Sequence, residues 1–271
     1  MSLLKRFRFF NAVDSRPTVV TFTGGMGAQI ISAAAYFFLK GEGQEVYADL
    51  SYFDQAECVA MVGKTGDVSH WSWQLDPFGL DRNSFEQAAA YSGREVSLIE
   101  DGPQKMKLGL KALAQPEVQK RFAIVGNADD VLPPGFSSGY LCVHVRRGDY
   151  VNVASHLVSD REFFELAGKF VGLVKHLVVV SDSPIEEDFR QTISSGYEQA
   201  VFLDGADVYA SHRIMRNARI LVCSNSQFSL IAALLNSRAL VVLPKQWFGQ
   251  KDLEAPIHEA CGFQIVNSCV K

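Results

Sequence analysis

Short segments rich in glycine and polar residues follow the apolar runs at which β-strands are predicted. Five of them stand at or just before a predicted helix: Gly24–Gly27, Arg146–Tyr150, Ser181–Asp182, Asp204–Asp207 and Ser224–Gln227. In an open parallel sheet, ligands bind at the carboxyl ends of the strands, where loops and helix N-termini converge. We therefore expect these segments to line a binding site.

Arg146 and Arg147 end one of the predicted strands. Two guanidinium groups beside a core are costly unless an anion satisfies them, and the rigid donor fork of arginine fits phosphate oxygens. Ser226 and Gln227 are predicted near a helix N-terminus, where backbone N–H groups and the helix dipole also favour an anion. Together these residues predict a diphosphate site. The alternative for Arg147 is a salt bridge with Asp149 that only stabilises the turn.

Asp182 is a carboxylate among residues that otherwise favour an anion. It would fit a guanine ring, because a carboxylate accepts the adjacent N1–H and N2–H donors of guanine as a pair. The alternative is that Asp182 caps the helix predicted from Pro184. Gly24, Gly25 and Gly27 also have two interpretations, a loop that lines the site or only a tight turn between strand and helix.

Units of one strand and one helix recur along the chain. A strand, a glycine turn and a helix occupy the first 40 residues, and a second strand follows at 44–49. Residues 51–134 are less regular and contain a predicted helix near 104–114. Five further strands are predicted at 140–145, 176–180, 199–203, 219–223 and 239–243. Nearly continuous apolar strands alternating with helices predict an α/β fold with parallel sheets, in two domains, 1–138 and 139–271, that face each other across a cleft.

The composition narrows the class of protein. The chain has 271 residues with a net charge of −4, 48% hydrophobic and 21% charged residues, which suits two medium-sized folded domains and not a general nucleic-acid binder. The cysteines form no CxxC pair, which indicates reduced buried thiols in a cytosolic protein and no zinc site.

The first ten residues alternate basic and aromatic side chains. No run of about 18 apolar residues predicts a transmembrane helix. Lys5, Arg6 and Arg8 lie among phenylalanines, which indicates either peripheral contact with an anionic membrane or a first strand or frayed terminus.

HVRRGDY at 144–150 resembles the signature of the α-1,2-fucosyltransferases of glycosyltransferase family 11, which are related to the α-1,6- and protein O-fucosyltransferases. Other blocks follow in the family's order: GGMGAQI at 24–30, FVGLVKHLVVVSDSPIEEDF at 170–189, DVYASHRIMRNARILVCSNSQFSLIAALLN at 207–236 and LPKQWF at 243–248. The resemblance covers the N-terminal loop and most of residues 140–248. Ala28 and the pair Leu230 and Ile231 depart from the family's usual asparagine and tryptophans.

The resemblance implies a GT-B fold of two Rossmann-like domains, with the acceptor on the N-terminal and the donor on the C-terminal domain. It implies GDP-β-L-fucose as donor, inversion at the fucose anomeric carbon, and no metal or other cofactor. It maps Arg146 to the β-phosphate, where we expect its loss to be most damaging, and Asp182 to the guanine. The residues that it maps to the donor are His144, Arg146, Asp182, Ser226, Gln227, Gly25 and Gly27.

Asp149 and His156 are candidates for the catalytic base because they lie in or near the signature. The alternatives are the Arg147 salt bridge for Asp149 and a surface loop position for His156. Trp71, Trp73 and Phe78 are candidates to stack on the acceptor sugar, and the alternative is a local hydrophobic cluster.

The hypothesis is therefore transfer of L-fucose to a galactose-containing oligosaccharide or lipid-linked glycan, with an α-1,2 linkage. By analogy with the family, it would belong to bacterial polysaccharide or O-antigen synthesis in the cytoplasm, at or near the inner membrane. Two alternatives stay open: another GDP-sugar glycosyltransferase, using for example GDP-mannose, and a catalytically silent nucleotide-sugar-binding protein.

Overall fold

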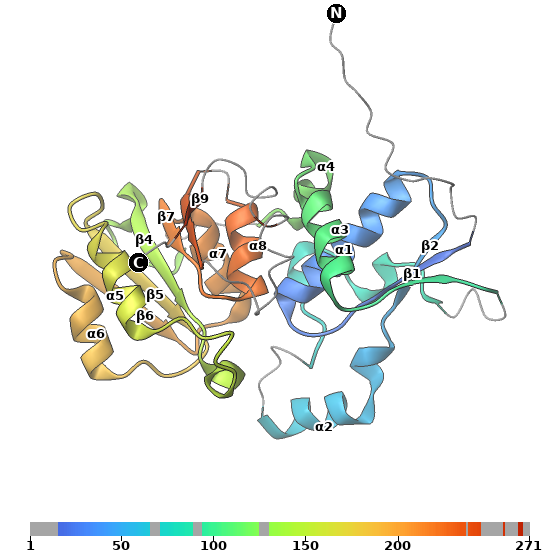
Figure 1. Cartoon of the computed structure of the whole chain (residues 1–271), viewed down its shortest axis with the longest axis horizontal. Helices are drawn as coiled ribbons and strands as arrows, with labels where there is room; N and C mark the ends of the chain where they lie inside the picture. The colour runs from blue at the N-terminus through green and yellow to red at the C-terminus, as the bar shows by residue number, and fades with distance from the viewer. Residues whose placement is uncertain are drawn as a thin grey trace, which may run out of the picture.

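The computed structural model describes residues 16–65, 71–88, 94–124, 130–236, 238–244, 257 and 265–267. The first unit is a three-stranded parallel sheet in the order β2-β1-β3 (Figure 1). Its strands are β1 (Thr18–Thr21), β2 (Val46–Asp49) and β3 (Ser97–Ile99). No strand was predicted at β3, because this segment of three residues is too short to display a periodic apolar pattern.

The second unit is a six-stranded parallel sheet in the order β6-β5-β4-β7-β8-β9. Its strands are β4 (Tyr140–Val145), β5 (His176–Ser181), β6 (Gln199–Asp204), β7 (Ile220–Val222), β8 (Leu240–Leu243) and β9 (Ile265–Asn267). All residues of the adjacent central strands β4 and β5 are buried. The strand order reverses between β4 and β7, and such a reversal is where open α/β sheets bind ligands.

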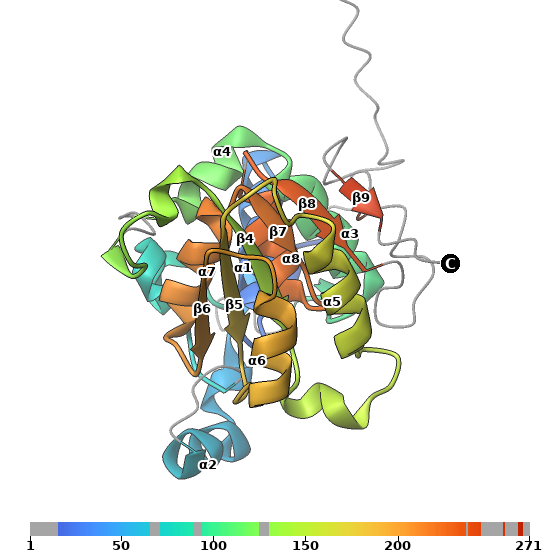
Figure 2. The ribbon, with the colours of Figure 1, turned by 90° about the vertical axis from the view of Figure 1, so that its left-hand side faces the viewer.

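Helices cover both faces of the second sheet (Figure 2). They are α5 (Asp160–Gly168) and α6 (Glu187–Ser194) on one face, and α7 (Val208–Asn217) and α8 (Gln227–Leu234) on the other. Alternate residues of β4 divide between two cores, since Val143 packs with Phe163 of α5 and Cys142 with Met215 of α7. This alternation follows from the two-residue period of side chains along a strand.

The first unit packs its sheet against α1 (Met26–Gly41) and α3 (Pro103–Leu113), the helix predicted near 104–114. The other described helices are α2 (Ala56–Thr65) and α4 (Pro116–Gln119), with short 3-10 turns that include η1 (Ser51–Asp54), η2 (Asp76–Phe78) and η8 (Gly148–Asn152). One hydrophobic core runs from Ile30 of α1 to Leu230 of α8, so the two units share a core.

The predicted α/β fold with two parallel-sheet units is confirmed, and it is the arrangement expected of a GT-B-like protein. The division near residue 138 and the cleft stay predictions. Cys58, Cys142 and Cys223 are buried thiols, in agreement with the expectation from the sequence. Within the described ranges, no helix is long and apolar enough to span a membrane. Lys5, Arg6 and Arg8 lie outside the described residues.

Candidate functional site

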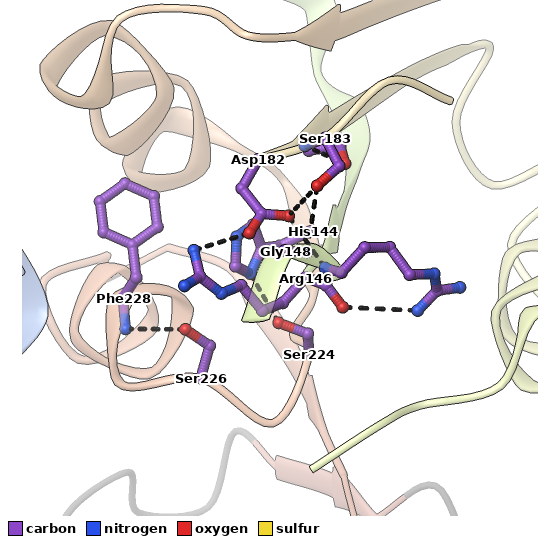
Figure 3. A network of polar contacts seen from close by, with 10 residues as sticks. His144, Arg146, Gly148, Asp182, Ser183, Ser224, Ser226 and Phe228 are labelled. Carbon is purple, nitrogen blue, oxygen red and sulfur yellow. Dashed lines mark hydrogen bonds and ion pairs between the residues drawn. The ribbon is translucent and has the colours of Figure 1, made fainter. Parts of the chain in front are cut away.

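The loops after β4 and β7 meet at the reversal of strand order. His144, the last but one residue of β4, shares a hydrogen bond of 2.7 Å with Ser224, which follows β7 (Figure 3). Both side chains are buried. Burial, and secondarily the charge of Arg146, lowers the pKa of His144 to about 3. His144 is therefore neutral near pH 7 and joins the two loops through a neutral hydrogen bond.

Arg146 follows β4 directly and pairs with Asp182, which follows β5. Arg146 Nη1 lies 2.7 Å from Asp182 Oδ2 (Figure 3). The guanidinium carbon of Arg146 lies 5.1 Å from the centre of the Tyr150 ring. Only 13% of the Arg146 side chain and 21% of the Asp182 side chain are exposed. The guanidinium group is thus held between a carboxylate and an aromatic ring, in a largely desolvated position where charge interactions are strong.

Asp182 also binds the main chain of the same loop. Its Oδ1 atom accepts a hydrogen bond of 2.9 Å from the Arg147 N–H group. The alternative role of Asp182 as a helix cap is wrong, because α6 starts three residues after Pro184, at Glu187, with Glu186 as its N-cap. Asp182 joins the loops after β4 and β5 instead.

The absence of a side chain at Gly148 leaves room for the ion pair between Arg146 and Asp182. Its φ angle is +23°, and a Cβ atom there would lie 2.5 Å from Asp182 Oδ2. The Gly148 N–H group donates to Ser183 Oγ at 3.0 Å. A side chain at this position would therefore push the carboxylate away from Arg146, which gives the glycine of the RRGD segment a steric reason.

Arg147 turns away from Arg146. It forms an ion pair with Asp160 at the start of α5 and donates a hydrogen bond of 3.0 Å to the Val158 carbonyl. Arg147 therefore ties this loop to the start of α5 through Asp160, and its predicted salt bridge with Asp149 stays a prediction. The expected partner Asp149 lies in η8, and its side chain is outside the described residues.

The N-termini of α1 and α8 meet between the two units. Ser226 is the N-cap of α8, and its Oγ atom accepts from the Phe228 N–H group at 3.3 Å. Gly25 is the N-cap of α1, and Gly27 lies against the main chain of Gln227. The first turns of α1 and α8 contain no acidic residue. Two positive helix termini at one place favour a bound anion.

His156 lies on the loop between η8 and α5. Its ring contacts the Tyr150 ring at a centroid distance of 5.0 Å. The Asn225 side chain donates a hydrogen bond of 3.1 Å to the neighbouring Ser155 carbonyl, which attaches this loop to the segment after β7. Tyr150 and Asn225 were not among the predicted site residues, although both lie inside segments expected to line the site.

The three aromatic candidates for the acceptor lie in different surroundings. Trp73 packs against Phe53 and Phe85 and donates to the Leu80 carbonyl at 3.0 Å. Phe78 lies in the shared core with its ring 5.5 Å from Tyr209. Trp73 and Phe78 therefore pack as members of a hydrophobic cluster, which was the alternative to stacking on the acceptor sugar. Trp71 is half-buried and lies parallel to Tyr52, with ring centroids 6.5 Å apart.

Among the described residues, no group of three or more His, Cys, Asp or Glu side chains is arranged to hold a metal ion. What the arrangement can do is bind an anion through Arg146 and the two helix N-termini, next to a neutral imidazole.

One part of the chain, which contains Arg146 and Ser226, matches a known protein family. Residues 135–260 match the model of a family described as Glycosyl transferase family 11. The match confirms the resemblance seen in the sequence and identifies this part as a glycosyltransferase-type domain. A search of curated proteins finds no match.

Several solved structures resemble the chain at low sequence identity. Escherichia coli heptosyltransferase WaaC with ADP is 11% identical, with a TM-score of 0.44 over 84% of this chain and 87% of that chain. POFUT1 in complex with GDP is 14% identical, with a TM-score of 0.47 over 84% and 97%. Fucosyltransferase NodZ from Bradyrhizobium is 13% identical, with a TM-score of 0.41 over 82% and 94%.

Proposed function

We propose that this protein transfers L-fucose from GDP-β-L-fucose to a galactoside hydroxyl, with inversion and an α-1,2 linkage. The observation that carries the proposal is the position of Arg146. Its guanidinium group is held by Asp182 and Tyr150 at the reversal of strand order, inside the part of the chain that matches glycosyl transferase family 11.

The diphosphate of the donor binds at Arg146 and at the joined helix N-termini. Ser226 and Gln227 stand at the start of α8, and Gly25 and Gly27 stand at the start of α1. The backbone N–H groups at these two helix N-termini donate to the phosphate oxygens. A hydrogen bond to a charged group contributes about 1.5–3 kcal/mol, so a few of them account for micromolar affinity. Glycine at 27 brings the two termini close enough to act on one anion.

Binding of the donor requires an exchange of partners at Arg146. The β-phosphate replaces the Asp182 carboxylate, which is then available to the two adjacent N–H donors of guanine. The hydrogen bond between Asp182 and the Arg147 N–H group keeps the carboxylate in the loop during this exchange. His144 lies beside the nucleotide and, through Ser224, keeps the loops after β4 and β7 together.

Arg146 acts mainly in the transition state. As the bond between the fucose anomeric carbon and the β-phosphate oxygen breaks, its electron pair stays on GDP, and negative charge grows on the β-phosphate. A fixed guanidinium group directed at this oxygen stabilises the charge where it develops, which raises turnover more than binding. The acceptor oxygen attacks the opposite face of the anomeric carbon, so the configuration inverts, and the reaction as proposed needs no metal.

We further propose where the acceptor binds and in which cellular process the reaction takes place. The acceptor is a galactose-containing oligosaccharide or lipid-linked glycan bound on the 1–138 side, and the donor lies on the 139–271 side. Such a reaction belongs to bacterial polysaccharide or O-antigen synthesis in the cytoplasm. Lys5, Arg6 and Arg8 would add peripheral contact with the inner membrane. Asp149 and His156 stay candidates for the catalytic base.

A thermal-shift panel of GDP, UDP, ADP and GDP-fucose tests the donor. GDP and GDP-fucose should raise the melting temperature, because a ligand that binds only the folded state stabilises it by mass action. Stabilisation by UDP or ADP but not GDP would refute the guanine assignment. The reaction is tested by GDP release from GDP-fucose and from GDP-mannose, with and without lactose. Greater release from GDP-mannose would favour another GDP-sugar transferase, and no release from either donor would favour a silent binding protein.

A further inference from the structure

A second polar cluster lies at the carboxyl edge of the N-terminal sheet, outside the donor site. Thr23 follows β1 and donates its hydroxyl hydrogen to Asp101, which follows β3. Lys105 of α3 pairs with the other oxygen of Asp101 and donates to the Thr21 carbonyl at 2.8 Å. Because β1 and β3 are neighbouring parallel strands, their ends bring these residues together.

The charges of this cluster are unevenly exposed. Only 4% of the Lys105 side chain is exposed, whereas 58% of the Asp101 side chain is exposed. Burial lowers the pKa of Lys105, and the contact with Asp101 opposes that shift. The lysine and Thr23 thus hold the carboxylate from the protein side and leave it accessible from outside. An aligned and accessible carboxylate is what a proton acceptor requires.

An aromatic pair includes a residue that follows β2, at the same carboxyl edge of the sheet. Tyr52 follows β2, and its ring is parallel to that of Trp71 within 12°. Burial raises the pKa of Tyr52 to about 12, with smaller contributions from Cys58 and Asp101, and an interaction with the Gly24 backbone opposes them. The Tyr52 hydroxyl therefore stays protonated near neutral pH. Half-buried aromatic rings beside a few polar groups are typical of ligand sites.

One turn connects this cluster to the donor site. Thr23 lies in the cluster, and Gly27, four residues later, contacts the main chain of Gln227 at the N-terminus of α8. A ligand at Asp101 and a diphosphate at α8 would therefore lie on the two ends of the same short segment. The two other candidates for a base, Asp149 and His156, come from the donor unit.

We propose that Asp101 binds the acceptor hydroxyl and takes its proton, with the acceptor sugar lying against Trp71 and Tyr52. The inference rests on the proposed function and names the acceptor subsite, a place for an uncharged sugar. In the step, the acceptor oxygen forms its bond to the anomeric carbon as the bond to the β-phosphate breaks. The proton of the acceptor moves to an Asp101 oxygen and then to water, and the electron pair of the broken bond leaves with GDP.

The test compares three variants: Asp101→Asn, Asp101→Glu and Glu100→Gln. Asp101→Asn keeps the shape and removes the base, Asp101→Glu restores a carboxylate, and Glu100→Gln removes the same charge from an exposed neighbour outside the cluster. For each variant, GDP release from saturating GDP-fucose is measured with a panel of lactose, N-acetyllactosamine and methyl β-galactoside, and with water alone as acceptor. The stabilisation by GDP is measured in parallel.

Loss of a general base lowers kcat by ~10²–10⁴-fold. We expect this loss in Asp101→Asn, with unchanged stabilisation by GDP. Asp101→Glu should recover part of the activity, and Glu100→Gln should equal the wild type. If Asp101→Asn binds GDP and keeps a third or more of the wild-type kcat, the inference about Asp101 is wrong and the proposed function still stands. A wild type that GDP does not stabilise overturns the proposed function and, with it, the inference.

Discussion

Gly27 of α1 lies directly against Gln227 of α8, where a Cβ atom at position 27 would be 2.7 Å from the Gln227 carbonyl carbon. This contact joins the two units at the point where both helices begin. Because the opposing atoms belong to the main chain, they cannot turn aside as the end of a flexible side chain could. The spacing of the two helix N-termini therefore depends on the absence of a side chain at this position.

Gly27→Ala should separate the two helix N-termini. We expect a loss of about 1–3 kcal/mol in the free energy of unfolding, typical of overpacking, and a weaker stabilisation by GDP. Urea denaturation and thermal shift with GDP measure the two effects. The matched control is Gly41→Ala at the other end of α1, where a Cβ atom meets nothing within 4 Å. This control should be neutral or more stable by about 0.4–1 kcal/mol. Equal effects of both substitutions would contradict the role of Gly27.

Arg146→Ala should lower turnover far more than donor affinity. Removal of one donor to a developing anion costs ~10²–10³-fold in kcat, and we expect that loss with a smaller change in KM for GDP-fucose. Arg146→Lys should not restore activity, because an ammonium group lacks the planar fork that spans two oxygens. The control is Arg161→Ala in α5, whose side chain is 87% exposed. A folded Arg146→Ala protein with near-normal transfer would refute the proposed mechanism.

Asp182→Asn separates two roles of this carboxylate. If Asp182 binds guanine, the variant loses stabilisation by GDP and keeps its response to ADP and UDP, because an amide offers only one acceptor to the two guanine donors. Thermal shifts with the three nucleotides give the answer. The control is Glu198→Gln, which removes an exposed carboxylate from the ion pair with Lys175 and should leave nucleotide preference unchanged. Equal changes with all three nucleotides would mean that Asp182 only orients Arg146.

His144 should make the protein less stable in acid. Its folded-state pKa of about 3 lies below the ordinary value of 6.5, so the unfolded chain binds the proton more readily between these values. The stability from neutral His144 is complete above pH 6.5 and is lost as the pH falls toward 3, at up to about 1.4 kcal/mol per pH unit.

His144→Asn should reduce this slope of stability against pH, as measured by urea denaturation between pH 7 and pH 4. The slope should not vanish, because burial also lowers the pKa of His212. Ser224→Ala is the control: it removes the hydrogen bond to His144 but leaves the burial that causes most of the shift. An unchanged slope in His144→Asn would contradict the buried neutral state of the imidazole.

Much of the fold and the residue types of the donor site could be read from local patterns. Apolar runs such as β4 and β5 predicted buried parallel strands, and the residues after them identified Arg146, Asp182 and Ser226 as members of one edge. These inferences need only the period of side chains and the rule that ligands bind where parallel strands end. The family model matches residues 135–260, which contain the resembling blocks between 144 and 248, whereas the block at 24–30 lies outside the match.

The tertiary structure decided which residues meet. Ser224 lies eighty residues after His144 and contacts it only because β4 and β7 are neighbouring strands. Arg147 forms its ion pair with Asp160, which the sequence did not predict. The strand before Asp101 has three residues, too few for a pattern, so nothing local indicated its cluster. Strand order and partner choice depend on how the whole core packs, which pairs residues distant in sequence, whereas strand and helix periods are set by neighbouring residues alone.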